Sequence, residues 1–169
     1  MSITLYAQPY DISASGFYFD NAETFRAKAS ALRNAYGDPV EEFEIQFIDG
    51  DAIDAALFEA LGIHQGTASL FFEKVEEWDE HEKLRLIIAA GEGGYDFDIE
   101  TGDPNDFDLD IYETSDMEAL AREFVEEGLF GEIPKHLANY IDYDAIARDL
   151  AMDYTATVIC GEHLIYRLS

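Results

Sequence analysis

Carboxylates are the only side chains in this sequence that occur in the numbers and spacing needed for a shared chemical task. The chain has 37 Asp and Glu against 10 Lys and Arg, which gives a formal charge of -27 at pH 7. Two long tracts, between Arg33 and Lys74 and between Arg85 and Arg122, contain acids and no Lys or Arg. Carboxylates gathered in this way can accept hydrogen bonds from a basic partner, ligate a hard cation or exchange protons.

The acids of these two tracts are the candidate partner-binding residues, and we expect each to contribute modestly. In the first tract they are Asp38, Glu41, Glu42, Glu44, Asp49, Asp51, Asp54 and Glu59. In the second tract they are Asp96, Asp98, Glu100, Asp103, Asp106, Asp108 and Asp110. A solvated acidic face is the simpler interpretation, and the sequence leaves it open.

The spacing of the acids does not match a known calcium loop. A frame that starts at Asp106 places acids at alternate positions, as an EF-hand requires. Ile111 then stands where the sharp turn needs Gly, and Met117 stands where the closing Glu belongs. We therefore predict no metal site and no cofactor, and at most weak, non-specific binding of divalent cations.

No catalytic constellation stands out in the sequence. The four His residues are scattered, without a pair at metal-ligand spacing on a helix. Cys160 and nearby His163 would suit a nucleophile and its base, but a buried cysteine in a strand is the more ordinary interpretation. We predict that the protein is not an enzyme.

Composition restricts the partner. Phosphate contacts need clustered Lys and Arg, so the charge of -27 argues against nucleic acid and against anionic membranes. No apolar stretch approaches the roughly 20 residues of a spanning helix, and with a single cysteine we expect a cytoplasmic protein. Solubility needs a net charge of only about 2 to 8 in a small domain. The excess therefore points to a basic partner.

The amount of charge is comparable with that of a short DNA duplex. Duplex DNA carries one negative charge per roughly 1.7 Å of axis, so about 27 charges correspond to some 45 Å, or around thirteen base pairs. Arg binds a carboxylate or a phosphate in the same bidentate geometry. The composition thus permits a nucleic-acid mimic without demonstrating one.

The pattern of apolar residues predicts an α+β protein of three small domains. Residues 1–62 form an α/β-type end domain with short antiparallel strands, residues 63–106 a mainly helical acidic middle domain, and residues 107–169 a second end domain with sheet and helices. In the first domain we expect strands over 2–7, 16–20 and 42–48, and helices over 22–36 and 51–61. Tyr36 is expected on the apolar face of the helix that Gly37 ends.

The middle and last domains are expected to be richer in helix. In the middle we predict helices over 68–78 and 80–90, followed by an acidic loop or linker. In the last domain we predict a strand over 108–112, helices over 116–127, 134–140 and 143–152, and a hairpin of strands over 154–160 and 164–168. Ser115 is expected to cap the first of these helices.

Residues 129–142, LFGEIPKHLANYID, resemble the antirestriction motif of the ArdA antirestriction family. The following residues 143–150, YDAIARDL, are similar to the run that comes after the motif in that family. The resemblance is specific over these two segments and extends more loosely over the last third and the first sixty residues. The middle third is similar only in its acidity and length.

The resemblance implies an elongated, dimeric, acidic protein that imitates bent duplex DNA. It implies that the partner is a type I restriction–modification enzyme, whose DNA-binding groove is occupied competitively so that a mobile genetic element escapes cleavage. The motif is implied to form the homodimer interface, through Leu129, Phe130, Gly131, Glu132, Ile133, Pro134, Leu137, Tyr140 and Asp142.

Two alternatives remain at this point. The apolar residues of the motif are as compatible with core packing under a helix that starts at Pro134 as with an interface. The chain as a whole is also compatible with an acidic adaptor or chaperone-like inhibitor of another basic nucleic-acid-binding protein.

Overall fold

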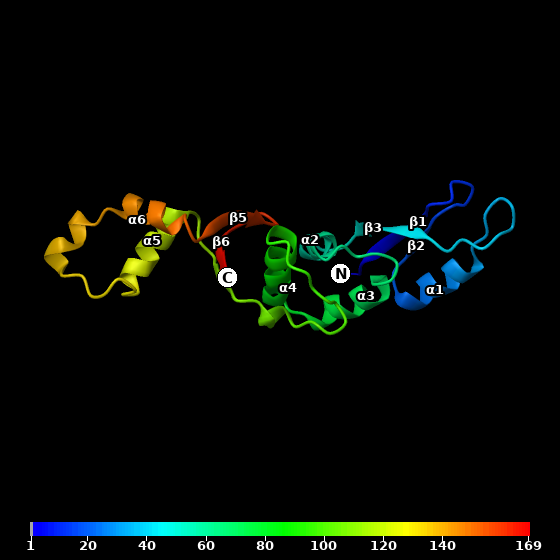
Figure 1. Cartoon of the computed structure of the whole chain (residues 1–169), viewed down its shortest axis with the longest axis horizontal. Helices are drawn as coiled ribbons and strands as arrows, with labels where there is room; N and C mark the ends of the chain where they lie inside the picture. Colours follow the sequence, from blue (N-terminus) through cyan, green and yellow to red (C-terminus); the bar gives the residue numbers. More distant parts are fainter. Residues whose placement is uncertain (1) are drawn as a thin grey trace. The chain divides into compact units, whose positions relative to one another are not determined.

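The computed structural model describes residues 2–169, which divide into two compact units. Unit 1 runs to Asp106, and unit 2 spans Phe107–Ser169 (Figure 1). Each unit contains one three-stranded antiparallel sheet together with helices, so the predicted α+β class is confirmed. The division into three domains stays a prediction.

The sheet of unit 1 has the order β2-β1-β3, with β1 (Thr4–Pro9) between β2 (Phe17–Phe19) and β3 (Phe43–Asp49). Side chains in β1 alternate between buried and half-buried positions, as expected for a strand that covers a core on one face. The core beside it is aromatic: the rings of Phe17, Phe25 and Phe43 contact one another edge to face or tilted. These contacts attach helix α1 (Ala22–Ala31) to the sheet.

Helix α1 ends well before Tyr36, so the predicted helix over 22–36 is wrong at its C-terminal end. Leu32 is already extended, and Tyr36 is 84% exposed instead of lying on an apolar helix face. The cause is Asn34, whose side-chain oxygen accepts hydrogen bonds from the backbone N–H groups of Tyr36 and Asp38, both at 2.9 Å. Such local side-chain bonds offer the backbone an alternative to the helix.

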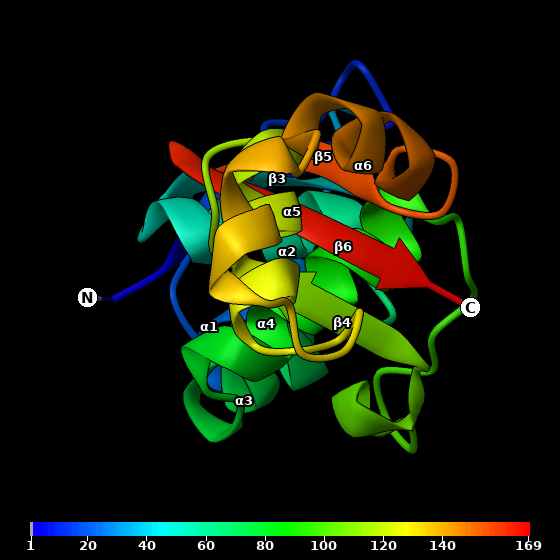
Figure 2. The same ribbon diagram turned by 90° about the vertical axis from the view of Figure 1, so that its left-hand side faces the viewer.

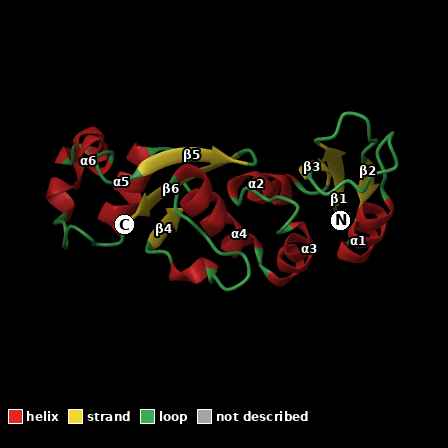
Figure 3. Ribbon diagram, turned by 45° about the vertical axis from the view of Figure 1, so that its right-hand side comes forward, coloured by secondary structure: helices red, strands yellow, loops and turns green. Residues whose placement is uncertain are grey.

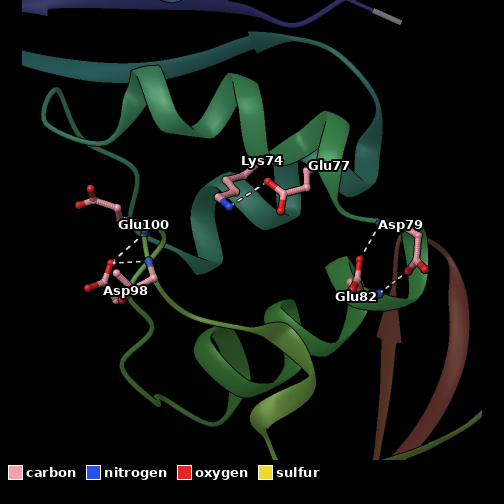
Figure 4. Close-up of polar contacts among 7 residues, drawn as sticks. Lys74, Glu77, Asp79, Glu82, Asp98 and Glu100 are labelled. Atoms are coloured by element: carbon pink, nitrogen blue, oxygen red, sulfur yellow. Dashed lines mark hydrogen bonds and ion pairs between the residues drawn. The ribbon is translucent and has the colours of Figure 1, made fainter.

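Between β3 and residue 92 unit 1 is mainly helical, as Figure 3 shows by colour. It comprises α2 (Ala52–Ala60), α3 (Ala68–Glu77) and α4 (Glu80–Leu86), and α4 continues as a π-helical turn, η1 (Ile87–Glu92). Leu57, Phe71 and Leu86 are fully buried between these helices. Asp79 and Glu82 form a capping box at the start of α4, which fixes where the chain turns (Figure 4).

The acidic stretch after η1 is an ordered loop with a short 3₁₀ turn, η2 (Pro104–Asp106). Arg85 of α4 donates a hydrogen bond from Nε to the Pro104 carbonyl at 3.1 Å. The ring of Phe97 packs against Trp78 with centroids 5.8 Å apart. The loop is therefore attached to unit 1 through both its backbone and its apolar side chains.

The sheet of unit 2 has the order β4-β6-β5 (Figure 2, where β4 and β6 lie side by side). Its elements are β4 (Leu109–Tyr112), α5 (Met117–Glu126), the 3₁₀ helix η3 (Lys135–Tyr140), α6 (Tyr143–Leu150), β5 (Thr155–Ile159) and β6 (Glu162–Leu168). Leu120 and Phe124 of α5 pack with Ile165 of β6 to form the core.

Two local predictions in unit 2 were wrong. Asp116, not Ser115, caps α5, because its carboxylate accepts a hydrogen bond from the backbone N–H of Ala119 at 2.8 Å. Cys160 is exposed in the turn between β5 and β6 instead of buried in a strand. Its φ of 51° and that of Gly161, 84°, match the left-handed conformation that a tight two-residue hairpin turn requires.

No helix within the described residues 2–169 has the length and apolar character needed to span a bilayer.

The buried ion pair between Lys83 and Asp54 provides a test of the packing in unit 1. Their side chains are 12% and 6% exposed, and Nζ lies 2.7 Å from Oδ1. Asp54→Ala would leave the Lys83 ammonium buried without its partner, so we expect the free energy of unfolding to fall by about 3–5 kcal/mol in urea titrations. Asp144→Ala is the control, because the Asp144–Arg148 pair is 76% and 67% exposed; its loss should cost below about 1 kcal/mol. Equal effects of the two substitutions would contradict the expectation.

Candidate partner-binding surface

The acids of the first tract lie on the surface of unit 1, with one exception. Asp38, Glu41 and Glu42 are exposed in the loop between α1 and β3, and Glu44 is exposed on β3 itself. Asp49, Asp51 and Glu59 are also exposed, at the end of β3 and along α2. Asp54 is the exception.

The acids of the second tract are mostly carried by the ordered loop after η1. Asp96, Asp98, Glu100, Asp103 and Asp106 are all exposed there. The Asp98 carboxylate accepts hydrogen bonds from the backbone N–H groups of Glu100 at 2.9 Å and Thr101 at 3.4 Å (Figure 4). These bonds favour the ionised form and hold the pKa of Asp98 below its ordinary value of 3.8. The turn thus keeps this carboxylate charged and fixed in position.

Two of the candidate acids already have a basic partner. Asp54 is buried against Lys83, and half-buried Asp110 of β4 lies 2.9 Å from the guanidinium of Arg167. The same hydrogen bond raises the pKa of Arg167 above its ordinary value. These two carboxylates hold elements of their own units together, and the remaining candidates, Asp108 of unit 2 included, are the exposed set.

The exposed set has few basic residues near it in the sequence, and the described ion pairs involve none of its members. The ion pairs described in residues 2–169 are Lys74–Glu77, Lys83–Asp54, Arg122–Glu118, Arg148–Asp144 and Arg167–Asp110. Ten Lys and Arg can neutralise at most ten of 37 acids one to one. Unit 1 therefore presents almost the whole exposed set to solvent, where these carboxylates can accept hydrogen bonds from Lys and Arg.

The search for stretches without Lys or Arg missed some acids that the fold brings together. A cavity of about 650 Å³ in unit 1 is lined by Asp20, Glu73 and Glu76 together with Asp51 and Asp54. Asp20 and Glu76 lie outside the two tracts, and Glu73, the last acid of the first tract, was not among the candidates. A search for tracts without Lys or Arg cannot find acids that come together only through folding.

The apolar residues of 129–142 are not part of the core of unit 2. Leu129 is 62% exposed, Phe130 56%, Leu137 46% and Tyr140 83%, while Ile133 is half-buried. Gly131, Glu132, Pro134 and Asp142 are exposed as well. Asp142 caps α6 by accepting a hydrogen bond from the Ala145 N–H at 3.0 Å. Of the two interpretations of this segment, burial within the same chain does not agree with the structure.

The structure gathers no group of three or more His, Cys, Asp or Glu suited to a metal ion within the described residues. Cys160 and His163 are both exposed at the turn of the β5–β6 hairpin. What the surface offers chemically is many acceptors of hydrogen bonds from cations, with an exposed apolar segment beside them in sequence.

The hydrogen bonds of Asp98 predict a pH-dependent contribution to stability. Because the folded pKa lies below 3.8, the stabilisation is present at neutral pH and is lost as the pH falls through that lowered pKa. Asp98→Ala should therefore destabilise the protein at pH 6. The difference in the free energy of unfolding between this variant and the natural chain should shrink below pH 3.8. Urea titrations at several pH values measure the difference, and carboxyl NMR measures the pKa directly. A difference independent of pH, or a titration midpoint at or above 3.8, would contradict this assignment.

Comparison with known proteins places the chain in a family. No curated protein matches it. The family model described as antirestriction protein (ArdA) matches residues 15–163, which include both acidic tracts and the segment 129–142. The match covers most of the 169 residues. The chain therefore belongs to the ArdA antirestriction protein family.

Proposed function

We propose that this protein is a DNA mimic that occupies the DNA-binding groove of type I restriction–modification enzymes and blocks them competitively. Membership of the ArdA family implies antirestriction. The observation that supports the mechanism is the exposed set of carboxylates, which lie on unit 1 and, through Asp108, on unit 2, and for which no ion pair is described within residues 2–169.

Binding begins with long-range attraction. A surface of one sign raises the rate at which a partner of the opposite sign is encountered, and the effect falls steeply with ionic strength. A groove built to hold phosphates is lined with Lys and Arg, which bind carboxylates through the same charge-assisted hydrogen bonds. The carboxylates replace phosphates one by one, so no single acid is decisive.

Ordered acids suit this task better than a disordered acidic tail. Asp98 is fixed by backbone hydrogen bonds, and Glu44 by its place on β3. A disordered chain would lose conformational entropy on entering the groove, whereas a folded surface has already lost it. The same rigidity restricts binding to partners whose cations match the spacing of the acids.

The segment 129–142 is the proposed homodimer interface. Its four large apolar side chains are about half exposed or more within a single chain, and burying them against a second copy would remove them from water. A dimer would also double the number of carboxylates presented to one enzyme. Type I enzymes act on DNA that enters the cytoplasm. The protein would protect a mobile genetic element there.

An acidic adaptor for another basic protein is the second candidate. The negative charge would serve an adaptor as well as a DNA mimic, but the target would differ. An adaptor would leave a type I methyltransferase bound to its DNA. The family match favours the first candidate, because its description names antirestriction.

Neutralising six exposed acids together tests the distributed-charge mechanism. In the variant Glu41→Gln, Glu42→Gln, Glu44→Gln, Glu59→Gln, Asp96→Asn and Glu100→Gln, each lost contact should remove a fraction of a kcal/mol. We expect the half-inhibitory concentration for displacement of duplex DNA from a type I methyltransferase to rise about tenfold to a hundredfold, with a flatter dependence on salt.

The single variant Glu44→Gln is the matched control, and it should change the half-inhibitory concentration by less than about threefold. Abolition of inhibition by this one substitution would contradict a distributed mechanism. Failure of the natural protein to displace DNA at any salt concentration would refute mimicry and favour the adaptor.

The dimer is tested by Leu137→Ser combined with Tyr140→Ser. The natural protein should sediment as a dimer in analytical ultracentrifugation and the variant as a monomer, because the substitutions remove apolar contact area at the interface. Met152→Ser, at a position 81% exposed outside the segment, is the control and should leave the dimer intact. A dimer that survives the double substitution would place the interface elsewhere.

A further inference from the structure

Two loops of unit 1 carry exposed apolar side chains at the same end of the first sheet (Figure 1, dark blue and cyan). One loop, residues 10–16, joins β1 to β2, and the other, residues 32–42, joins α1 to β3. Ile12 is 100% exposed, Tyr36 84% and Tyr10 65%. We call these three side chains with their loops the loop tip.

Hydrogen bonds through Asp11 and Ser13 join the two loops. The Asp11 carboxylate accepts from the backbone N–H of Ser13 at 2.9 Å, from its hydroxyl at 2.7 Å and from the side-chain amide of Asn34 at 2.9 Å. The Ser13 hydroxyl in turn accepts from the backbone N–H of Ala35 at 3.3 Å. Ile12 therefore lies between two residues that are each bonded to the other loop.

The backbone beside both tyrosines is fixed as well. Asn34 accepts from the N–H of Tyr36 through its side chain and donates its own N–H to the Asp38 carbonyl at 3.0 Å. The N–H of Tyr10 donates to the Glu42 carbonyl at 3.2 Å. The loop tip is thus a rigid surface that holds three large apolar side chains in water.

A rigid exposed aromatic residue is the type of side chain that anchors protein interfaces. Tyr is enriched among the residues that carry most of the binding energy, because it buries a large area at a small loss of conformational freedom. Ile12 and Tyr36 lie outside the core of unit 1, so packing does not explain why these exposed positions carry apolar side chains.

The surrounding charge identifies the partner. Asp38, Glu41 and Glu42 are exposed in the same loop as Tyr36, and Arg33 is its one basic residue, so the loop that carries Tyr36 is net acidic. A second copy of the chain would bring like charges together, and an anionic membrane would be repelled. A protein surface with an apolar depression and a basic border is complementary in both respects.

We propose that the loop tip docks on such a depression beside the DNA-binding groove of the restriction–modification enzyme. The proposal rests on the proposed function and adds a contact that DNA itself does not make. It gives the inhibitor a part of its affinity that does not depend on salt, because apolar burial is not screened by counterions.

Competition against duplex DNA on a type I methyltransferase at several salt concentrations tests this proposal. The variant Ile12→Ser with Tyr36→Ser should raise the half-inhibitory concentration about tenfold at every salt concentration and leave the slope against salt unchanged. The matched control, Met152→Ser with Val158→Thr, changes two other exposed apolar residues and should have no effect. Circular dichroism and thermal unfolding verify that each variant is folded.

A second variant separates rigidity from side-chain identity. Asn34→Ala keeps Ile12 and Tyr36 but removes the side-chain bond to Asp11 between the two loops and the side-chain bonds to Tyr36 and Asp38 within the second loop. It should also weaken competition at unchanged slope. Equal competition by the natural protein and the Ile12/Tyr36 variant would overturn the docking proposal alone. Failure of the natural protein to compete would overturn the proposed function and this proposal together.

Discussion

Repulsion among carboxylates is the constraint to which the rest of this structure responds. With 37 acids and 10 basic side chains, most negative charges have no cation with which to pair, and compaction brings them closer together. Apolar burial supplies the opposing force: the aromatic cluster between α1 and the first sheet, the Leu57–Phe71–Leu86 contacts of the helices, and the Leu120–Phe124–Ile165 core of unit 2. Acids appear almost exclusively outside these clusters, and the one that is buried, Asp54, has Lys83 beside it.

Part of the negative charge stabilises the fold locally. Asp79, Asp116 and Asp142 each cap a helix and satisfy a backbone N–H that has no partner within the helix. Helix N-termini carry partial positive charge, so an acid there is favourable even in a strongly negative protein. The acids of the exposed set cap no helix through a side-chain hydrogen bond, although Asp98 and Asp103 accept backbone hydrogen bonds within their own loop. For the other acids of this set no such bond is described in residues 2–169, which agrees with the proposed role in binding.

The sequence predicted most of the secondary structure because apolar periodicity was strong in both units. It failed where a side chain acts on the backbone or where the fold brings distant residues together. Asn34 ends α1 early through bonds to its own turn, and nothing in the helical spacing of Tyr36 signals this. Similarly, the acids of the two tracts were visible in the sequence, but the pairing of Asp110 with Arg167 joins strands that are far apart in the chain. The exposure of Leu137 and Tyr140 also required the structure, because an apolar segment near a helix suits a core equally well.

Charge and apolar contact have different consequences for an inhibitor that competes with DNA. DNA binding weakens with salt through counterion release, and contacts between carboxylates and cations weaken with salt through screening, so salt lowers the affinity of both competitors. An additional apolar contact multiplies the affinity of the inhibitor by a factor that does not change with salt, so it gives the same advantage over DNA at every ionic strength. On the proposed mechanism the loop tip and the acidic tracts therefore make separable contributions: the carboxylates would direct the protein to a groove built for phosphates, and the exposed apolar side chains would add affinity that salt does not remove.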